Sequence, residues 1–230
     1  MKTTDNGTPM QKERGTRIFT VVVLALLCAM ILAAIIVPIG IYRSQGEKTV
    51  SYGAITVRTD LYVFWLSAYK YAYLSAAMRQ DPTVTDSPEF WNSAPDGKTT
   101  RAAEARAGAE GWIKRIVFAA SLFEEEDLSL SKSTLNDLQT VCDHLLQYEL
   151  NTEKAYDRAA KEIGFNYSTV RRALFYQTEG EAYVGPLNDA DYETFCTIAE
   201  SAVTILPAAA KIDFITLPTD ARLYSTPYLP

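Results

Sequence analysis

An uncharged segment near the N-terminus constrains this chain more than any other feature. Residues 18–42 read IFTVVVLALLCAMILAAIIVPIGIY, which is 25 residues without a charged side chain. A helix rises about 1.5 Å per residue, so about 20 apolar residues cross the roughly 30 Å hydrocarbon core of a bilayer. The sequence therefore predicts a transmembrane helix over 18–42, with the lipid bilayer as its partner.

The charges on either side of this segment predict its orientation. Basic residues are more frequent before the segment than just after it: Lys2, Lys12, Arg14 and Arg17 against Arg43 and Lys48. Positive charge is retained on the cytoplasmic side of a membrane. We therefore expect a cytoplasmic tail (1–17), a single-pass signal anchor in the cell membrane (18–42) and an extracytoplasmic remainder (43–230).

A cleaved signal peptide is the alternative interpretation of the same segment. Its apolar region would normally have about 7–15 residues and end at a small-x-small cleavage site. The segment here is longer, and ILAAIIVPIG (31–40) contains no such site followed by a polar stretch. An uncleaved anchor is the preferred interpretation.

Charge limits what the exported part can bind. The whole chain has a net charge of −6, and residues 1–42 contain four basic and two acidic side chains, which leaves −8 on residues 43–230. A protein that binds a phosphate backbone needs a basic surface, so we expect no nucleic-acid partner. An acidic surface instead favours solubility.

The residues that usually carry chemistry are scarce. The chain has one histidine, His144, and three cysteines, and no CxxC, HExxH, GxSxG or GxxxxGK[ST] motif. We therefore predict no catalytic residue, no metal site and no cofactor. A disulfide between Cys142 and Cys196 is possible outside the cell, but two buried free thiols are the preferred interpretation. The acidic run EEED (124–127) is interpreted as a solvated patch rather than a cation site.

Apolar periodicity and turn residues divide the exported part into elements. The predicted helices cover 61–79, 101–126, 132–148, 153–163, 169–184 and 189–204. Asp60 and Ser168 are the expected N-caps of the first and fifth of these helices. The predicted strands are a small hairpin within 50–58 and the alternating segment KIDFITL (211–217), and 80–99 is predicted to be a loop.

These elements define the expected fold class and domains. The fold is predicted to be mainly α, with about five to six helices and a small β element near residues 50–58 and 211–217. The predicted divisions after the anchor are a linker with a possible β-hairpin (43–59), a helical domain (60–206) and a strand with an irregular tail (207–230).

The first predicted helix is unusually aromatic. Residues 59–78, TDLYVFWLSAYKYAYLSAAM, contain six aromatic side chains and a single charge after Asp60. A helix that is apolar nearly all round is covered on most sides, so the preferred interpretation is a central core helix. Alternatively, part of its aromatic face lines a groove for polypeptides, since tyrosine combines apolar area with a polar tip. The candidate polypeptide-binding residues are Tyr62, Trp65, Tyr69 and Tyr73 of this helix and Trp112 of the helix predicted over 101–126.

Several segments in order resemble one protein family. They are VSYGAITVRTDLYVFWLSAYKYAYLSAA (50–77), FWNS (90–93), ASLFEEEDLSLS (120–131) and AAKEIGFNYSTVRRAL (159–174). Together they resemble the N-terminal chaperone module of membrane-anchored SurA/PrsA-type foldases, in the SurA-like peptidylprolyl isomerase family. The resemblance covers roughly residues 49–215, and it implies that 60–206 is a chaperone domain that holds unfolded chains.

The chain departs from this family at its C-terminal end. In full-length members a parvulin-type isomerase domain follows or is inserted, and AAKIDFITLP (209–218) lies where its first strand would begin. The position of that strand's histidine reads Asp213, and 13 residues follow Leu217. We therefore expect no prolyl isomerase activity.

The expected function follows from these observations. The chain is predicted to be a membrane-anchored extracytoplasmic protein that binds unfolded or secreted polypeptides through apolar and aromatic surface, without catalysis. The alternative is a structural or assembly subunit of a cell-envelope complex with one fixed protein partner.

Overall fold

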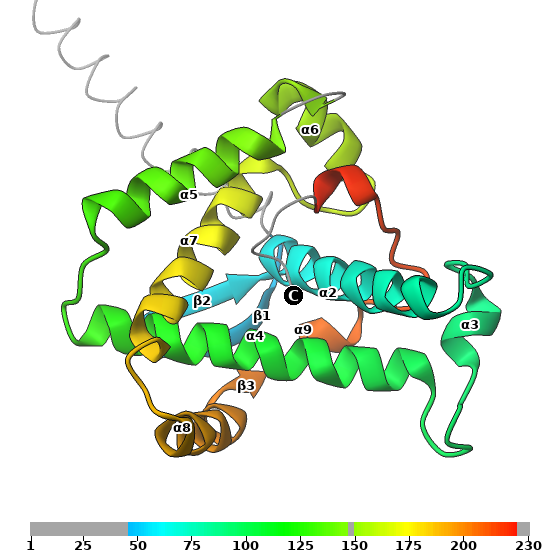
Figure 1. Ribbon diagram of the computed structural model, residues 1–230, viewed down its shortest axis with the longest axis horizontal. Helices are drawn as coiled ribbons and strands as arrows, with labels where there is room; N and C mark the ends of the chain where they lie inside the picture. The colour runs from blue at the N-terminus through cyan, green and yellow to red at the C-terminus, as the bar shows by residue number, and fades with distance from the viewer. Residues whose placement is uncertain (1–45, 147–149, 225–230) are drawn as a thin grey trace, which may run out of the picture. The chain divides into compact units, whose positions relative to one another are not determined.

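The computed structural model describes residues 46–146 and 150–224, which are mainly helical with one small three-stranded sheet (Figure 1). The predicted fold class is confirmed at this level. The predicted cytoplasmic tail (1–17) and transmembrane anchor (18–42) lie outside the described residues. Within the described part of the chain, no helix is both long and apolar enough to cross a membrane.

The elements of the described residues follow one another along the chain. The strands are β1 (Lys48–Tyr52), β2 (Ile55–Arg58) and β3 (Thr204–Ile205). The longer helices are α2 (Thr59–Gln80), α4 (Arg101–Glu125), α5 (Lys132–Leu145), α7 (Tyr167–Val184) and α8 (Asp189–Ala202). The shorter helices are α3 (Pro88–Asn92), α6 (Glu153–Ala160), α9 (Pro207–Ala210) and the 3₁₀ helix η2 (Ala221–Leu223).

The predicted hairpin near residues 50–58 is confirmed. β1 and β2 are antiparallel, and Tyr52 pairs with Ile55 across a two-residue turn. Gly53 in this turn has a φ of 52°, a conformation that glycine adopts without steric cost. β3 pairs with the other edge of β1, so the sheet order is β2-β1-β3.

The core lies around α2, which contacts α4 and α7 (Figure 1). Leu61, Tyr62, Phe64, Trp65 and Leu66 are all 0% exposed. α4 and α7 also pack closely on each other, because Gly180 of α7 leaves room for α4. A Cβ at Gly180 would lie 3.3 Å from the Cβ of Ala119. The central-core interpretation of the aromatic helix therefore holds for its first half.

Both predicted N-caps are wrong. β2 leads directly into α2, so Arg58 occupies the N-cap position and makes no side-chain cap bond. Asp60 is instead 5% exposed and accepts hydrogen bonds from Thr169 Oγ1 and Arg172 Nη2, both at 2.8 Å. In α7 the cap is Asn166, whose Oδ1 accepts from the Thr169 backbone N at 2.9 Å.

The predicted strand over 211–217 is also wrong. Phe214 and Leu217 are the buried residues, and their spacing of three does not fit a strand's alternation. Asp213 folds the segment into a turn. Its side chain accepts from the backbone N of Ile215 at 3.0 Å and from Thr216 Oγ1 at 2.9 Å. The third strand lies earlier, at Thr204–Ile205.

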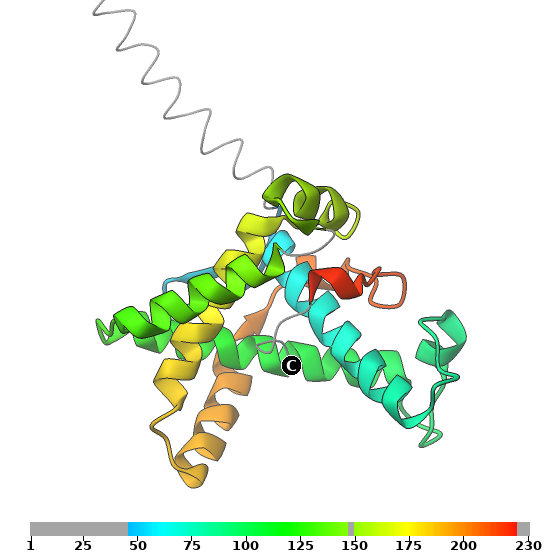
Figure 2. The same cartoon turned by 45° about the horizontal axis from the view of Figure 1, so that its top comes forward.

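The segment 80–99, predicted to be a loop, contains a short helix. Pro88 lies in the first turn of α3, and Ser87 caps it by accepting from the Phe90 backbone N. Trp91 is 0% exposed and anchors α3, with its ring 5.4 Å from that of Phe214. Figure 2 shows α3 at the end of α2 that is distant from α5.

Candidate functional site

The first two predicted binding residues belong to the interior. Tyr62 and Trp65 are each 0% exposed, so neither can contact a polypeptide in this structure. Tyr62 donates a hydrogen bond to Glu110 Oε1 at 2.9 Å, and burial together with Glu110 raises the pKa of Tyr62. Trp65 Nε1 donates to Gln177 Oε1 at 3.4 Å. Both residues are therefore corrected from candidate contact residues to core residues.

The other three predicted residues are partly exposed, and two of them, Tyr69 and Trp112, contact each other. Tyr73 donates to Glu104 Oε2 at 2.9 Å, and burial with this bond raises the pKa of Tyr73. Tyr69 lies nearer the middle of α2, with its ring 6.2 Å from that of Trp112. Trp112 also contacts Trp65 edge to face at 6.4 Å. Of these three residues, Trp112 lines a hollow.

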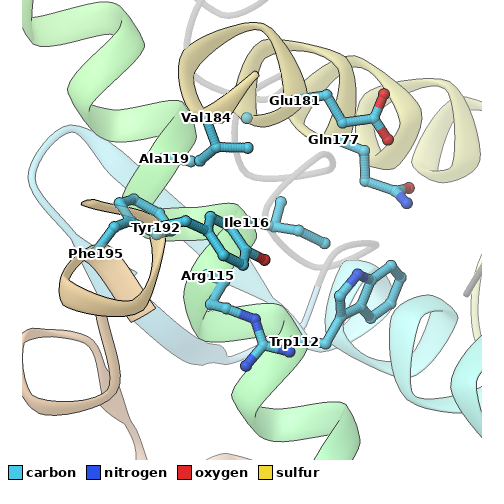
Figure 3. Close-up of a pocket in the computed structure, with 10 residues that line it drawn as sticks. Trp112, Arg115, Ile116, Ala119, Gln177, Glu181, Val184, Tyr192 and Phe195 are labelled. Atoms are coloured by element: carbon cyan, nitrogen blue, oxygen red, sulfur yellow. The ribbon is translucent and has the colours of Figure 1, made fainter. Parts of the chain in front are cut away.

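This hollow, named here the α8 hollow, lies between α4, α7 and α8 and has a volume of about 120 Å³ (Figure 3). α4 and α7 each contribute four lining residues, and α8 contributes two. Its apolar lining consists of Trp112, Ile116, Ala119, Val184, Tyr192 and Phe195. An apolar cavity of about 150 Å³ accepts benzene, so the α8 hollow suits one large apolar side chain.

Local sequence explains why α8 presents aromatic residues here. α8 is capped by Asn188 and buries only a narrow stripe, of which Phe195 and Ala199 are the buried members. Tyr192 lies one turn before Phe195, stacks on its ring at 6.1 Å and stays 42% exposed. A residue at this spacing lies on the same helix face. Tyr192 therefore forms an accessible edge of the hollow.

Polar groups surround the apolar lining. Arg115 and Glu181 lie on opposite sides of the opening in Figure 3. Arg115 forms an exposed ion pair with Glu200 at 3.8 Å. Removal from water raises the pKa of Glu181 and, with the neighbouring Cys196, that of Tyr192. The site thus has an apolar floor and a mixed-charge rim, as protein-binding surfaces commonly do.

A second hollow adjoins the first. It lies between α5 and α7, has a volume of about 100 Å³ and includes Leu138, Val141 and Leu174. Gln177 and Glu181 line both hollows. These two residues are one helical turn apart on α7, so they form a shared edge between the hollows. A chain lying across this edge can place one apolar side chain on each side.

The lining of the α8 hollow is poor in the side chains that usually act as nucleophiles. Catalysis by a nucleophile needs a base within hydrogen-bond reach, and the lining of the α8 hollow contains no serine, cysteine, histidine or lysine. Among residues 46–146 and 150–224, no group of three or more His, Cys, Asp or Glu could hold a metal ion. Cys142 and Cys196 are both free thiols, as predicted, but only Cys142 is buried, and Cys196 is partly exposed.

One residue of this site, Trp112, was predicted from the sequence, whereas its partners on α8 were not. Trp112 was a candidate because it is a large aromatic residue on an amphipathic helix. Tyr192 and Phe195 carry a weaker signal, an aromatic pair at i and i+3 in DYETFCTI (191–198). That spacing indicates a shared face but not which helix the face meets.

Comparisons with known protein families, curated proteins and solved structures find no significant match to this chain.

Proposed function

We propose that this chain is a membrane-anchored extracytoplasmic protein that binds apolar segments of unfolded or secreted polypeptides, without catalysing a reaction. The observation that carries the proposal is the α8 hollow, an open apolar depression bordered by the exposed ring of Tyr192. The adjoining hollow across the Gln177–Glu181 edge extends it, so a client can be held by two side chains.

Two further features support the proposal. Partners that must be released need only modest affinity, and two shallow hollows bury little area compared with stable protein interfaces. The net charge of −8 on residues 43–230 keeps a complex with an apolar client soluble and repels other copies of the chain. The resemblance to the SurA/PrsA chaperone module agrees with this function.

The test compares two variants of α8 in the full-length chain, reconstituted in nanodiscs. Tyr192→Ser removes the exposed aromatic edge of the hollow. Ile198→Ser is the matched control, because Ile198 lies on the same helix, is 46% exposed and lies outside the hollow. The measurement is light scattering by a chemically denatured model protein diluted into buffer. We expect the parent and I198S to slow aggregation equally and Y192S to lose most of this activity.

Two outcomes contradict the proposal. One is that the parent does not slow aggregation at all. The other is that Y192S and I198S behave alike. If the parent fails this test but a single envelope protein co-purifies with it at 1:1, the structural-subunit alternative takes its place.

A further inference from the structure

A third hollow also lies between α5 and α7, and Leu138 lines both it and the second hollow. It is larger, about 480 Å³, and is named here the arginine groove. Its lining comes from α5 and the first half of α7: Leu135, Leu138, Gln139, Cys142, Ser168, Arg171, Arg172 and Phe175. Leu135 and Phe175 are 43% and 37% exposed, so the apolar part of the groove is accessible. Ligand sites commonly have volumes of about 300–1,000 Å³.

The groove combines this apolar surface with two adjacent guanidinium groups. Arg172 is engaged, because its Nη2 donates to Asp60 Oδ2 at 2.8 Å, yet its buried Nε has no hydrogen-bond partner within the described residues. Arg171 is exposed and lies within hydrogen-bond reach of the Cys142 thiol, and none of the ion pairs found in the described part of the chain includes it. In a chain with a net charge of −6, a basic pair beside exposed Phe175 is distinctive.

The spacing of these groups indicates what they fit. Arg171 and Phe175 are at i and i+4 on α7, so their side chains are neighbours on one helix face. A guanidinium binds a carboxylate through two parallel hydrogen bonds. The C-terminal residue of a polypeptide carries its carboxylate and its side chain on the same Cα. A single terminal residue can therefore contact Arg171 and Phe175 together.

We infer that the arginine groove binds the free C-terminal end of a partner polypeptide whose last residue is apolar. The terminal carboxylate pairs with Arg171, and the last side chain packs between Phe175 and Leu135. The inference rests on the proposed function, because it states which part of a client polypeptide the arginine groove recognises. It adds specificity, since Arg115, the arginine that lines the α8 hollow, is already paired with Glu200.

The experiment measures peptide binding to the full-length chain in nanodiscs by fluorescence anisotropy. The probes are fluorescein-Gly-Ser-Ala-Leu as the free acid and the same peptide with a C-terminal amide. We expect the amide to bind at least about tenfold more weakly, the factor given by one hydrogen bond between charged groups. Arg171→Gln weakens binding of the acid to the level of the amide, and Arg171→Lys restores part of the difference.

Two controls separate this inference from the proposed function. Arg158→Gln removes an exposed arginine on neighbouring α6 that does not line the groove, and it leaves binding of the acid unchanged. Y192S changes aggregation of the denatured client but not the preference for acid over amide. Equal affinity for acid and amide overturns the inference, as does an R171Q chain that behaves like R158Q. Octanoate that competes as tightly as the peptide acid overturns the assignment to a polypeptide end.

Discussion

Lys70 is a charged residue inside the core, and its partners show why it is there. It is 1% exposed, and its Nζ donates to the carbonyl oxygens of Ile215 at 2.9 Å and Leu217 at 2.7 Å. Asp86 lies 3.3 Å away, and the Trp91 ring centroid 5.1 Å away. Burial lowers the pKa of Lys70, and Asp86 opposes this effect. One ammonium group thus joins α2 to two segments distant in sequence.

Lys70→Met is predicted to destabilise the protein by about 2–4 kcal/mol. The substitution keeps most of the side-chain volume but leaves two carbonyl oxygens without the ammonium donor and Asp86 without its positive partner. Removing one partner of a buried pair is costly. The measurement is urea unfolding of the full chain in detergent, followed by tryptophan fluorescence. Lys98→Met, at an exposed position, is the control. A K70M midpoint equal to that of K98M contradicts the prediction.

Glu179 makes stability depend on pH in the opposite direction from most carboxylates. It is 6% exposed, and its Oε2 has no hydrogen-bond partner within the described residues. Burial, with a smaller effect from Glu124, raises the pKa of Glu179 from 4.5 to about 7. Because the folded-state pKa is the higher one, the folded protein binds the proton more tightly than the unfolded chain does. The contribution of Glu179 to the free energy of unfolding is therefore fully present below about pH 4.5, and it is lost as the pH rises through 7.

Glu179→Gln is therefore predicted to stabilise the protein at pH 8 by about 1–3 kcal/mol and to have little effect at pH 5. The amide resembles the protonated carboxyl in shape and never ionises. Urea unfolding at both pH values gives the difference between variant and parent. Glu193→Gln, an exposed position on α8, is the control and is expected to show the same small difference at both pH values. A Glu179→Gln difference that does not grow between pH 5 and pH 8 excludes this assignment.

At the scale of elements, the hairpin turn is fixed against α4. Gly53 has a φ of 52°, and a Cβ added there would overlap Ser121 Oγ and contact Glu125 Oε1. Gly97 has a similar φ of 70° but has open space where its Cβ would be. The two glycines thus share the backbone strain that alanine would bring and differ in crowding.

Gly53→Ala is predicted to destabilise the protein by about 2–4 kcal/mol, and Gly97→Ala by about 1 kcal/mol. The smaller value is the cost of a left-handed backbone for a residue with a Cβ. The excess at Gly53 is the cost of moving Ser121 and the hairpin away from α4. Both variants are compared with the parent by urea unfolding. Equal losses at the two positions show that the turn does not pack on α4.

The sequence predicted the helices better than it predicted their ends and contacts. The helix predicted over 101–126 is α4 at Arg101–Glu125, because its apolar stripe has the period of a helix. Asp60 was predicted as an N-cap on local grounds, but its carboxylate pairs with Arg172, which is 112 residues away. Local pattern cannot detect a partner at that separation. The same limit explains the wrong strand over 211–217, whose turn is set by Asp213 and by contacts to Lys70.

The candidate site was predictable only in part for a similar reason. An aromatic helix such as α2 indicates large burial, but it does not show which rings remain exposed. Tyr62 and Trp65 are covered by α4 and α7, whereas Trp112 reaches the α8 hollow. Which face of α8 meets α4 depends on the β3–β1 pairing and on the packing of Phe195 against Phe118. Both contacts join residues that are far apart in sequence.

At the scale of the whole molecule, the residues after α8 hold the other elements together. Residues 207–230 were predicted to be a strand and an irregular tail, yet residues 204–224 make contacts with several elements of the domain. β3 extends the sheet, and Arg106 of α4 donates to the carbonyl oxygens of Ala209 and Ile212, both at 2.8 Å. The Leu223 carbonyl accepts from Tyr156 of α6 at 2.9 Å. This segment therefore connects the sheet, α4, α2 and α6.

A chain that ends after Ala202 is predicted to lose cooperative unfolding. Truncation removes the β3 partner of β1 and leaves the Lys70 ammonium in the core without the Ile215 and Leu217 carbonyls. Each of these losses is of the order of a few kcal/mol, and a whole domain is stable by only about 5–15 kcal/mol. Urea unfolding followed by tryptophan fluorescence should show a broad transition or none.

Lys211→Gln is the control for this truncation, because it changes the same segment without touching the core. It removes an ion pair to Glu47 whose side chains are 68% and 65% exposed, and such pairs contribute at most about 1 kcal/mol. We expect K211Q to unfold in one cooperative transition close to that of the parent. A truncated chain that also unfolds in one cooperative transition would contradict the prediction. It would show that the helices around α2 fold stably without the contacts of residues 204–224.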